Sequence, residues 1–258
     1  MNKSLSEQGF RMPAEWEKQR SVWIIWPYNK NDWPGLFKFI PKTVSEIVSI
    51  VSKTQTVNLI IKTKKDIKLI RKELKQGNYK KNNVKFHVIA SDRIWIRDSG
   101  PIFLRNTKNK KKIFLNFKFN GWAKYKNYKK DDKINTFISN STKIKKIDPK
   151  IKIKNKIKRI VLEGGSIDVN GKGSILLTKE CLLSKVQERN PGIKKKQYED
   201  LLCKYLNVSN FIWLNKGIIG DDTHGHVDDI SRFISKNTIL TAVEVNKKSP
   251  NYKILNDN

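Results

Sequence analysis

The sequence is poor in cysteine, in acidic residues and in long apolar stretches. Its two cysteines, Cys181 and Cys203, form no Cys-x-x-Cys pair, which disfavours a disulfide framework and a structural zinc site. No stretch approaches the roughly 20 apolar residues of a membrane-spanning helix. Residues 1–16 lack the apolar run of a signal peptide. We therefore expect a cytoplasmic protein with no membrane partner.

Basic residues are in large excess. Lys and Arg number 54 against 24 Asp and Glu, a formal net charge of +30, which would ordinarily suggest a polyanionic partner. Only 9 of the 54 are Arg, and the heavy use of Lys, Asn and Ile is typical of A/T-rich coding. Residues 106–112 and 143–158 are lysine-dense without the interleaved aromatic residues of single-stranded nucleic-acid sites. We expect both segments to be surface loops and nucleic-acid binding to be the weaker interpretation.

The apolar pattern alternates between the periods of strands and helices. With 38% hydrophobic residues in 258, the chain can build one large domain. The pattern predicts an α/β or α+β domain, in which the helix at 195–206 buries Cys203 on its apolar face. Strands are expected at 21–26, 57–61, 84–88, 113–119, 166–169, 174–178, 211–214 and 238–243, and helices at 44–51, 66–75 and 195–206.

Charged and large apolar residues are interleaved at 92–101, just before a Gly-Pro break. Strand alternation would place Asp98 with Ile94 and Ile96 and put Trp95 on the opposite face. A carboxylate beside apolar groups is costly unless it meets a cation. Asp98 therefore either binds a cation or caps a turn and pairs with Arg97, and the residues alone favour neither.

Residues 221–229 hold two of the three histidines and four carboxylates. The spacing of His224, His226 and Asp228 suits a metal site. It suits equally an acid/base histidine beside a carboxylate that holds a cationic substrate. A turn without chemistry is the third interpretation.

A Gly-Gly pair follows an apolar strand in Leu162-Glu163-Gly164-Gly165-Ser166. Such a pair usually marks a bulge or a turn. The Lys and Ser or Thr of a phosphate-binding loop are missing from their fixed positions.

These motifs, in this order, resemble the agmatine deiminase family, also called the Porphyromonas-type peptidylarginine deiminase family. The resemblance covers essentially the whole chain. It rests on residues 12–17, 23–27, 32–35, 95–101, 117–122, 162–166, 220–229, 242–244 and 250–252.

The resemblance implies the pentein fold, a β/α propeller of ββαβ modules around a central site. It implies hydrolysis of agmatine to N-carbamoylputrescine and ammonia, a step of putrescine biosynthesis, without metal or cofactor. Asp98 and Asp228 would hold the guanidinium and His226 would be the acid/base. Glu163 and Trp95 would complete the substrate-binding residues, and His224 receives no role.

The resemblance also exposes a difference. The family's nucleophile is a cysteine in a Gly-rich segment past the His-x-Asp element, and this sequence ends at Asn258 before reaching it. Cys181 lies in a region that the family does not use for chemistry. We therefore expect the chain to lack its last module and residues 1–258 to be inactive alone.

Three alternatives remain beside agmatine hydrolysis: peptidylarginine deiminase activity, an inactive remnant that only binds guanidinium, and a basic nucleic-acid-binding protein. If agmatine is the substrate, Glu163, Asp221 or Asp222 would hold its primary ammonium. A homo-oligomer is left open.

Overall fold

The computed structural model describes residues 3–153 and 156–258. The contacts divide the chain into two compact units, and the expectation that residues 1–258 form one catalytic domain stays a prediction. Unit 1 comprises Met1–Glu17, Arg97–Lys126 and Ile138–Asn258, and unit 2 comprises Lys18–Ile96 and Asn127–Phe137. The physical reason is that the apolar residues form separate cores, one around Leu59 in unit 2 and another around Leu177 in unit 1.

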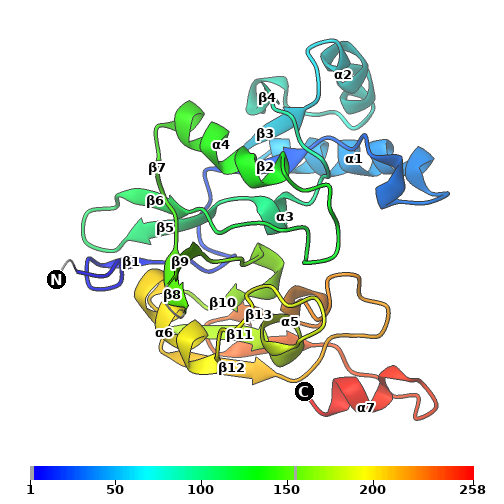
Figure 1. Ribbon diagram of the computed structural model, residues 1–258. Coiled ribbons are helices and arrows are strands. Elements are labelled where there is room, and N and C mark those ends of the chain that lie inside the picture. Colours follow the sequence, from blue (N-terminus) through cyan, green and yellow to red (C-terminus); the bar gives the residue numbers. More distant parts are fainter. Residues whose placement is uncertain (1–2, 154–155) are drawn as a thin grey trace. The chain divides into compact units, whose positions relative to one another are not determined.

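Unit 2 is built on a parallel three-stranded sheet flanked by helices (Figure 1). The strands at 21–25 and 56–61 are largely apolar, as expected for a parallel sheet whose two faces are covered, whereas the strand at 84–88 alternates apolar residues with Lys85 and His87. The elements are β2 (Ser21–Ile25), α1 (Ile40–Ser52), β3 (Thr56–Ile61), α2 (Asp66–Gln76) and β4 (Val84–Val88), with the short helices η1 (Lys30–Asp32), η2 (Phe37–Phe39), η3 (Lys81–Asn83) and η4 (Asp131–Lys133). Helix α4 (Ile134–Thr142) is divided between the units.

Unit 1 contains several small sheets, of which the largest has the order β1-β5-β6-β7. A second has the order β10-β11-β12, and its hairpin β10-β11 turns through Asn-Gly-Lys-Gly, where Gly171 and Gly173 have positive φ. The strands are β1 (Phe10–Arg11), β5 (Ile102–Asn106), β6 (Lys112–Leu115), β7 (Lys145–Ile147), β8 (Lys150–Ile153), β9 (Lys156–Arg159), β10 (Asp168–Val169), β11 (Ser174–Thr178), β12 (Asn210–Leu214), β13 (Ser231–Ser235) and β14 (Thr238–Thr241). The helices are α5 (Lys179–Leu183), α6 (Lys195–Leu206), α7 (Asn251–Asn256), η5 (Gly164–Ser166) and η6 (Val227–Asp229).

Three local expectations were wrong. Residues 92–101 contain no strand; the short helix α3 (Ile96–Ser99) occupies their centre. The carboxylate of Asp131 accepts the backbone N–H groups of Asp92 and Arg93, which satisfies donors that a strand would otherwise pair.

The second error concerns residues 143–158, which form β7, β8 and β9 instead of a loop. Lysine alternates with isoleucine there, and Ile147 and Ile151 pack against the core while lysines face outward. Residues 154 and 155 lie outside the described part. Between β5 and β6, residues 107–111 form an exposed turn. The third error is Cys203, which is exposed because α6 turns Leu201 and Leu202 inward instead.

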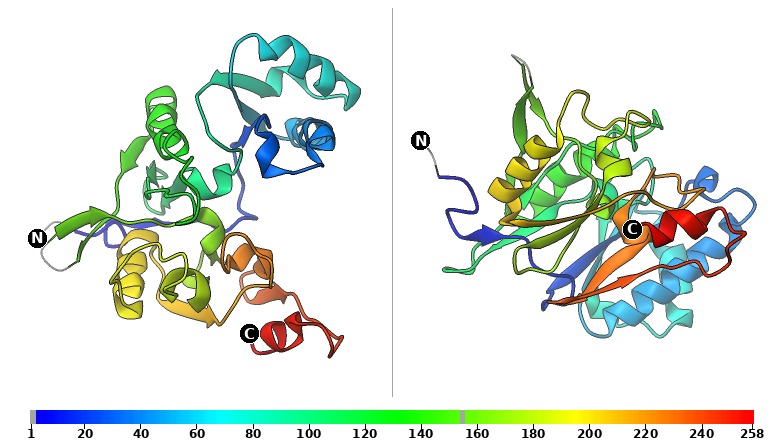
Figure 2. Two further views of the ribbon diagram at one scale, coloured as in Figure 1. Left: turned by 45° about the vertical axis from the view of Figure 1, so that its right-hand side comes forward. Right: turned by 90° about the horizontal axis from the view of Figure 1, so that it is seen from below.

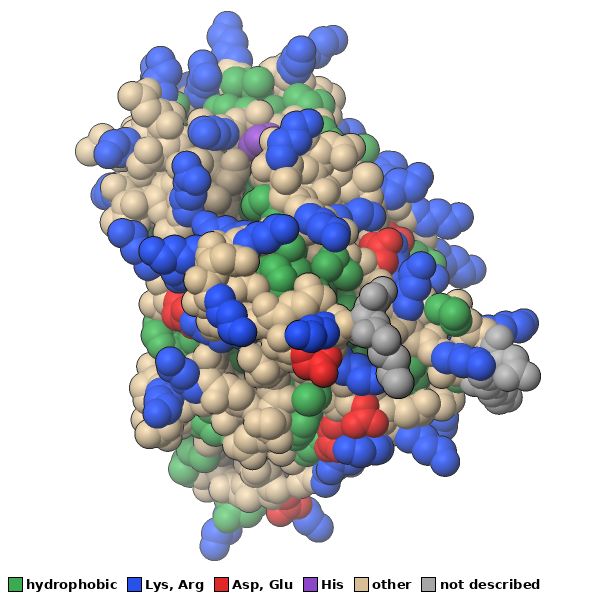
Figure 3. Space-filling model, turned by 90° about the vertical axis from the view of Figure 1, so that its left-hand side faces the viewer, with side chains coloured by type: hydrophobic (Ala, Val, Ile, Leu, Met, Phe, Trp, Pro, Cys, Tyr) green, Lys and Arg blue, Asp and Glu red, His purple; other side chains and the backbone are tan. Residues whose placement is uncertain are grey.

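Lys and Arg side chains are scattered over the face shown in Figure 3, with few acidic groups among them. In the described part of the chain, no helix is both long and apolar enough to cross a membrane. At the end of unit 1, β13 and β14 form a two-stranded ribbon that leads into α7 (Figure 2).

Candidate active site

Asp98 is the carboxylate of α3 and is buried, with 7% of its surface exposed. The indole Nε1 of Trp122 donates to its Oδ2 at 3.0 Å, and the backbone N–H of Gly165 donates to its Oδ1 at 3.1 Å. Burial raises the pKa of Asp98 to about 6 despite the nearby His226. A buried carboxylate of this kind is stabilised by a bound cation.

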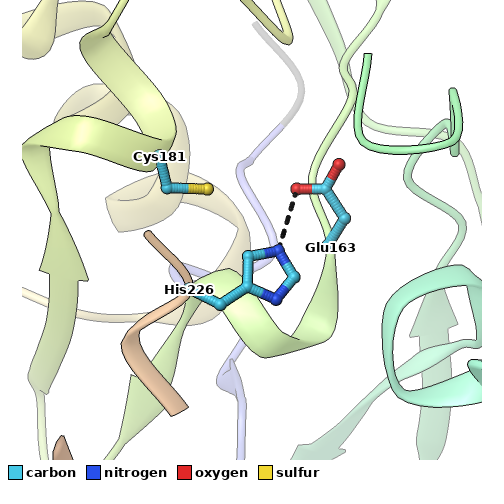
Figure 4. Close-up of side chains that lie close together, drawn as sticks. All are labelled: Glu163, Cys181 and His226. Carbon is cyan, nitrogen blue, oxygen red and sulfur yellow. Dashed lines mark ion pairs between the residues drawn. The ribbon is translucent and has the colours of Figure 1, made fainter. Parts of the chain in front are cut away.

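His226 lies beside Asp98 and presents its two ring nitrogens to different neighbours. Nδ1 is 3.7 Å from Asp98 Oδ1 and 3.9 Å from Asp228 Oδ1. Nε2 is 3.6 Å from Glu163 Oε2 (Figure 4). Burial opposes its charged form, but the Asp98 carboxylate, Cys181 and Glu163 together raise the pKa of His226 well above its usual value. A protonated His226 is suited to act as a general acid.

Asp228 supplies the second carboxylate on the Nδ1 side of the ring. It lies in η6, and its side chain is one-fifth exposed. Burial raises its pKa, although His226 and Arg97 act in the opposite direction. Asp98 and Asp228 thus bring two carboxylates to one histidine, and their expected role of holding a guanidinium stays a prediction.

The Gly-Gly pair of η5 lets the backbone approach these side chains closely. A Cβ atom at Gly165 would lie 2.5 Å from His226 Nδ1, 2.8 Å from Asp98 Oδ1 and 2.9 Å from Asp228 Oδ2. Such distances are shorter than non-bonded atoms tolerate, so only glycine fits. The pair therefore allows the site to assemble, a role beyond the turn or bulge that its sequence suggested.

Glu163 is fully buried and pairs with a cation that the sequence did not single out. Arg189 Nε lies 3.2 Å from Glu163 Oε1, and neither side chain is exposed. Although burial opposes ionisation, His226 and Arg189 lower the pKa of Glu163. Arg189 also donates to the backbone carbonyl oxygens of Gln187 and Thr223. This guanidinium therefore fixes Glu163 as a carboxylate facing His226.

Asp221 shapes the loop that carries His226. Its Oδ2 accepts the backbone N–H groups of Gly225 at 2.6 Å and His226 at 3.2 Å, and its Oδ1 accepts from Thr223. Asp222 instead faces solvent and pairs with Lys124 and Tyr125. Both carboxylates therefore already have partners. The expectation that Asp221 or Asp222 holds the primary ammonium of agmatine stays a prediction.

The other predicted residues, Trp95 and His224, have neighbours of their own. Trp95 belongs to unit 2, where its ring is 5.7 Å from that of Trp33, so its part in substrate binding stays a prediction. His224 Nε2 lies 3.2 Å from Ser184 Oγ. Among the described residues, the atoms able to bind a metal gather at Glu163, Cys181 and His226 rather than at both histidines.

Sequence reasoning missed Trp122 and Arg189, and it gave Cys181 no chemical role. Trp122 lies in a quoted motif, but nothing in the spacing tied its indole to Asp98. Arg189 follows α5 in a segment without a recognised pattern. Cys181 lies in α5, and its thiol is buried beside His226. Burial raises the pKa of this thiol.

Comparison with known proteins places this site in a family. Residues 11–258 match the model of the Porphyromonas-type peptidyl-arginine deiminases. A protein of Latilactobacillus sakei subsp. sakei assigned as an agmatine deiminase is 31% identical over 260 residues. The match covers 99% of this chain and 66% of that protein's length. A Streptococcus mutans relative with the same assignment is 32% identical over 254 residues, covering 98% and 66%. The chain spans about two thirds of the length of these relatives.

Solved structures of agmatine deiminases also match this chain. The agmatine deiminase of Enterococcus faecalis matches with a TM-score of 0.84 at 28% identity, covering 100% of this chain and 67% of that one. The agmatine deiminase of C. jejuni with substrate bound matches with a TM-score of 0.81 at 31% identity, covering 96% and 69%. The α/β fold class expected from the resemblance is thereby confirmed. The chain therefore belongs to the Porphyromonas-type peptidyl-arginine deiminase family.

Proposed function

We propose that the protein hydrolyses the guanidinium group of agmatine to give N-carbamoylputrescine and ammonia. The observation that carries this proposal is the convergence of Asp98 and Asp228 on one edge of His226, at 3.7 and 3.9 Å. A guanidinium is planar, permanently charged and rich in N–H donors, so two carboxylates can hold it in a fixed orientation.

The reaction then needs a nucleophile and a proton carrier. A thiolate adds to the guanidinium carbon, and protonated His226 gives its proton to the departing ammonia. Neutral His226 next removes a proton from water, whose oxygen attacks the thiouronium carbon and displaces the thiolate to leave the carbamoyl product. The thiol would come from the Gly-rich cysteine segment that family order places after residue 258.

Glu163 and Arg189 would support the proton carrier in this scheme. The Glu163 carboxylate faces His226 Nε2 at 3.6 Å while Arg189 holds its other oxygen. A fixed carboxylate beside an imidazole stabilises the imidazolium form. His226 would therefore enter the reaction with a proton to donate.

The competing substrate is an arginine side chain within a peptide, which presents the same guanidinium. The assignments of the relatives favour agmatine. The test is ammonia release from agmatine and from a blocked arginine peptide, using the chain completed with the cysteine segment of a relative. Faster turnover of agmatine is expected. Preference for the peptide would assign the site to peptidylarginine, and release from neither would contradict the proposal.

A further inference from the structure

The edge of His226 that faces away from Asp98 and Asp228 meets two further donor groups. Figure 4 shows the Cys181 thiol and the Glu163 carboxylate on the side of the ring that carries Nε2. The sulfur, a carboxylate oxygen and a ring nitrogen all lie within 4.8 Å of one another, and all three residues are buried. These residues come from α5, from the start of η5 and from the loop before η6.

Two of these polar atoms have no hydrogen-bond partner within the described residues, although both are buried: Glu163 Oε2 and His226 Nε2. Their separation of 3.6 Å is too long for a hydrogen bond. It does match ligand atoms on a tetrahedral zinc ion, which lie on the order of 3.3–3.8 Å apart because zinc–ligand bonds are about 2.0–2.3 Å. Burying unpaired polar atoms is costly, and a shared ion would satisfy both.

We propose that Glu163, Cys181 and His226 form a Zn²⁺ site that holds the enzyme in an inactive state. On binding, the Cys181 thiol and protonated His226 each release one proton to solvent, and Zn²⁺ gains bonds to Sγ, Nε2 and Oε2. The net charge of the cluster stays zero, since one divalent ion replaces two protons. Cysteine, histidine and glutamate are all common zinc ligands, and three protein ligands leave a fourth position for water.

Arg189, Asp98 and Asp228 determine which atoms remain available to the ion and to the substrate. Arg189 pairs with Glu163 Oε1 and so leaves Oε2 for the ion. Asp98 and Asp228 lie beside Nδ1, on the other edge of the ring, so the guanidinium site stays available. Zinc at Nε2 would take the place of one imidazolium proton, so that His226 is held as a neutral imidazole whose remaining Nδ1–H is too weak an acid to protonate the departing ammonia. The metal site itself does not depend on the proposed function; only the inhibition does.

The binding test uses purified residues 1–258 and Zn²⁺ alone, titrated by competition with a chromogenic chelator after long incubation, because the ligands are buried. Cys181→Ala should weaken binding by more than about 100-fold, beyond the loss typical of a residue that merely supports a ligand. The exposed Cys203→Ser and the neighbouring His224→Ala are matched controls and should bind like the parent. Absence of binding in the parent, or equal loss in a control, would overturn the site.

A spectroscopic test stays decisive even if Cys181→Ala fails to fold. In Cys203→Ser, Cys181 is the remaining cysteine of the sequence, so Co²⁺ should give a thiolate-to-metal charge-transfer band from that sulfur. Absence of the band would overturn the proposal. In the completed enzyme, Zn²⁺ should lower kcat with little change in KM, and chelator should restore it. Zinc binding without inhibition would overturn the inhibitory role alone, and inactivity without zinc would contradict the proposed function instead.

Discussion

At the scale of single residues, His226 differs from His224 in its surroundings, although the two are separated by one glycine. His226 is buried among Asp98, Asp228 and Glu163. His224 has a left-handed backbone (φ 64°) and lies beside Ser184. In a strand, residues two apart would share a face. The left-handed backbone at His224 and Gly225 instead sends one imidazole into the site and the other to a hydroxyl.

Replacing each histidine should separate their roles. In the completed enzyme, His226→Ala should lower kcat by about 10²–10⁴-fold, the usual contribution of proton transfer by a positioned side chain. His224→Ala should have a much smaller effect. Steady-state ammonia release measures both, and equal losses would show that the His-Gly-His element has been misassigned.

The raised pKa of Asp98 predicts how substrate capture depends on pH. Because burial raises that pKa to about 6, the carboxylate is charged above pH 6 and becomes neutral as the pH falls below it. A neutral Asp98 cannot pair with the guanidinium, so kcat/KM for agmatine should fall roughly tenfold per pH unit below 6.

Rate measurements between pH 5 and 8 check this dependence. Asp200→Asn is a control, since Asp200 is a solvent-facing carboxylate of α6 that pairs with Lys196, and its profile should follow the parent. A flat profile in the parent would mean that Asp98 keeps its charge or plays no part in binding.

At the scale of elements, the loops around η5 and η6 hold the site through buried ionic and backbone contacts. Arg189 and Glu163 have no exposed side-chain surface. Removing one partner of such a pair leaves an uncompensated buried charge.

Arg189→Met should therefore destabilise residues 1–258 by about 3–5 kcal/mol, as measured by urea unfolding. Lys185→Met is the control, because Lys185 pairs with Glu188 while 79% of its side chain is exposed, and surface pairs contribute little. An Arg189→Met protein as stable as the control would show that the pair does not support the fold.

Sequence patterns predicted the helices and strands that have a regular apolar periodicity. They missed the backbone conformation that a side chain from a distant position imposes. The apolar runs of β2 and β3, the alternation of β4 and the helical spacing of α6 were recognised directly. Residues 92–101 looked like a strand, but the Asp131 carboxylate takes their backbone donors from a distant position. The motifs identified Asp98, Glu163, His226 and Asp228, whereas Arg189 and Cys181 join the site only through folding.

At the scale of the whole molecule, apolar side chains remain exposed around the ribbon of β13 and β14. Ile234 is 55%, Leu240 63%, Val243 64% and Val245 85% exposed. Contiguous apolar surface next to a short sheet promotes association.

Residues 1–258 should therefore self-associate with rising concentration, as measured by analytical ultracentrifugation. Leu240→Lys combined with Val243→Lys should reduce the association. Val186→Lys, which changes an exposed valine elsewhere, should not. A monodisperse monomer with a sharp two-state melt would contradict this expectation.

The central claim is that Asp98 and Asp228 together hold a guanidinium beside His226. The most direct test is kcat/KM for agmatine in the completed enzyme with Asp98→Asn and with Asp228→Asn, which keep the shape and remove one charge. Each should lose roughly a hundred- to several-thousand-fold, since breaking a desolvated ion pair costs on the order of 3–5 kcal/mol. Asp200→Asn, at the exposed carboxylate of α6 that pairs with Lys196, should keep the parent value. Losses below about tenfold for both variants, a cost of about 1.4 kcal/mol or less, would contradict the claim.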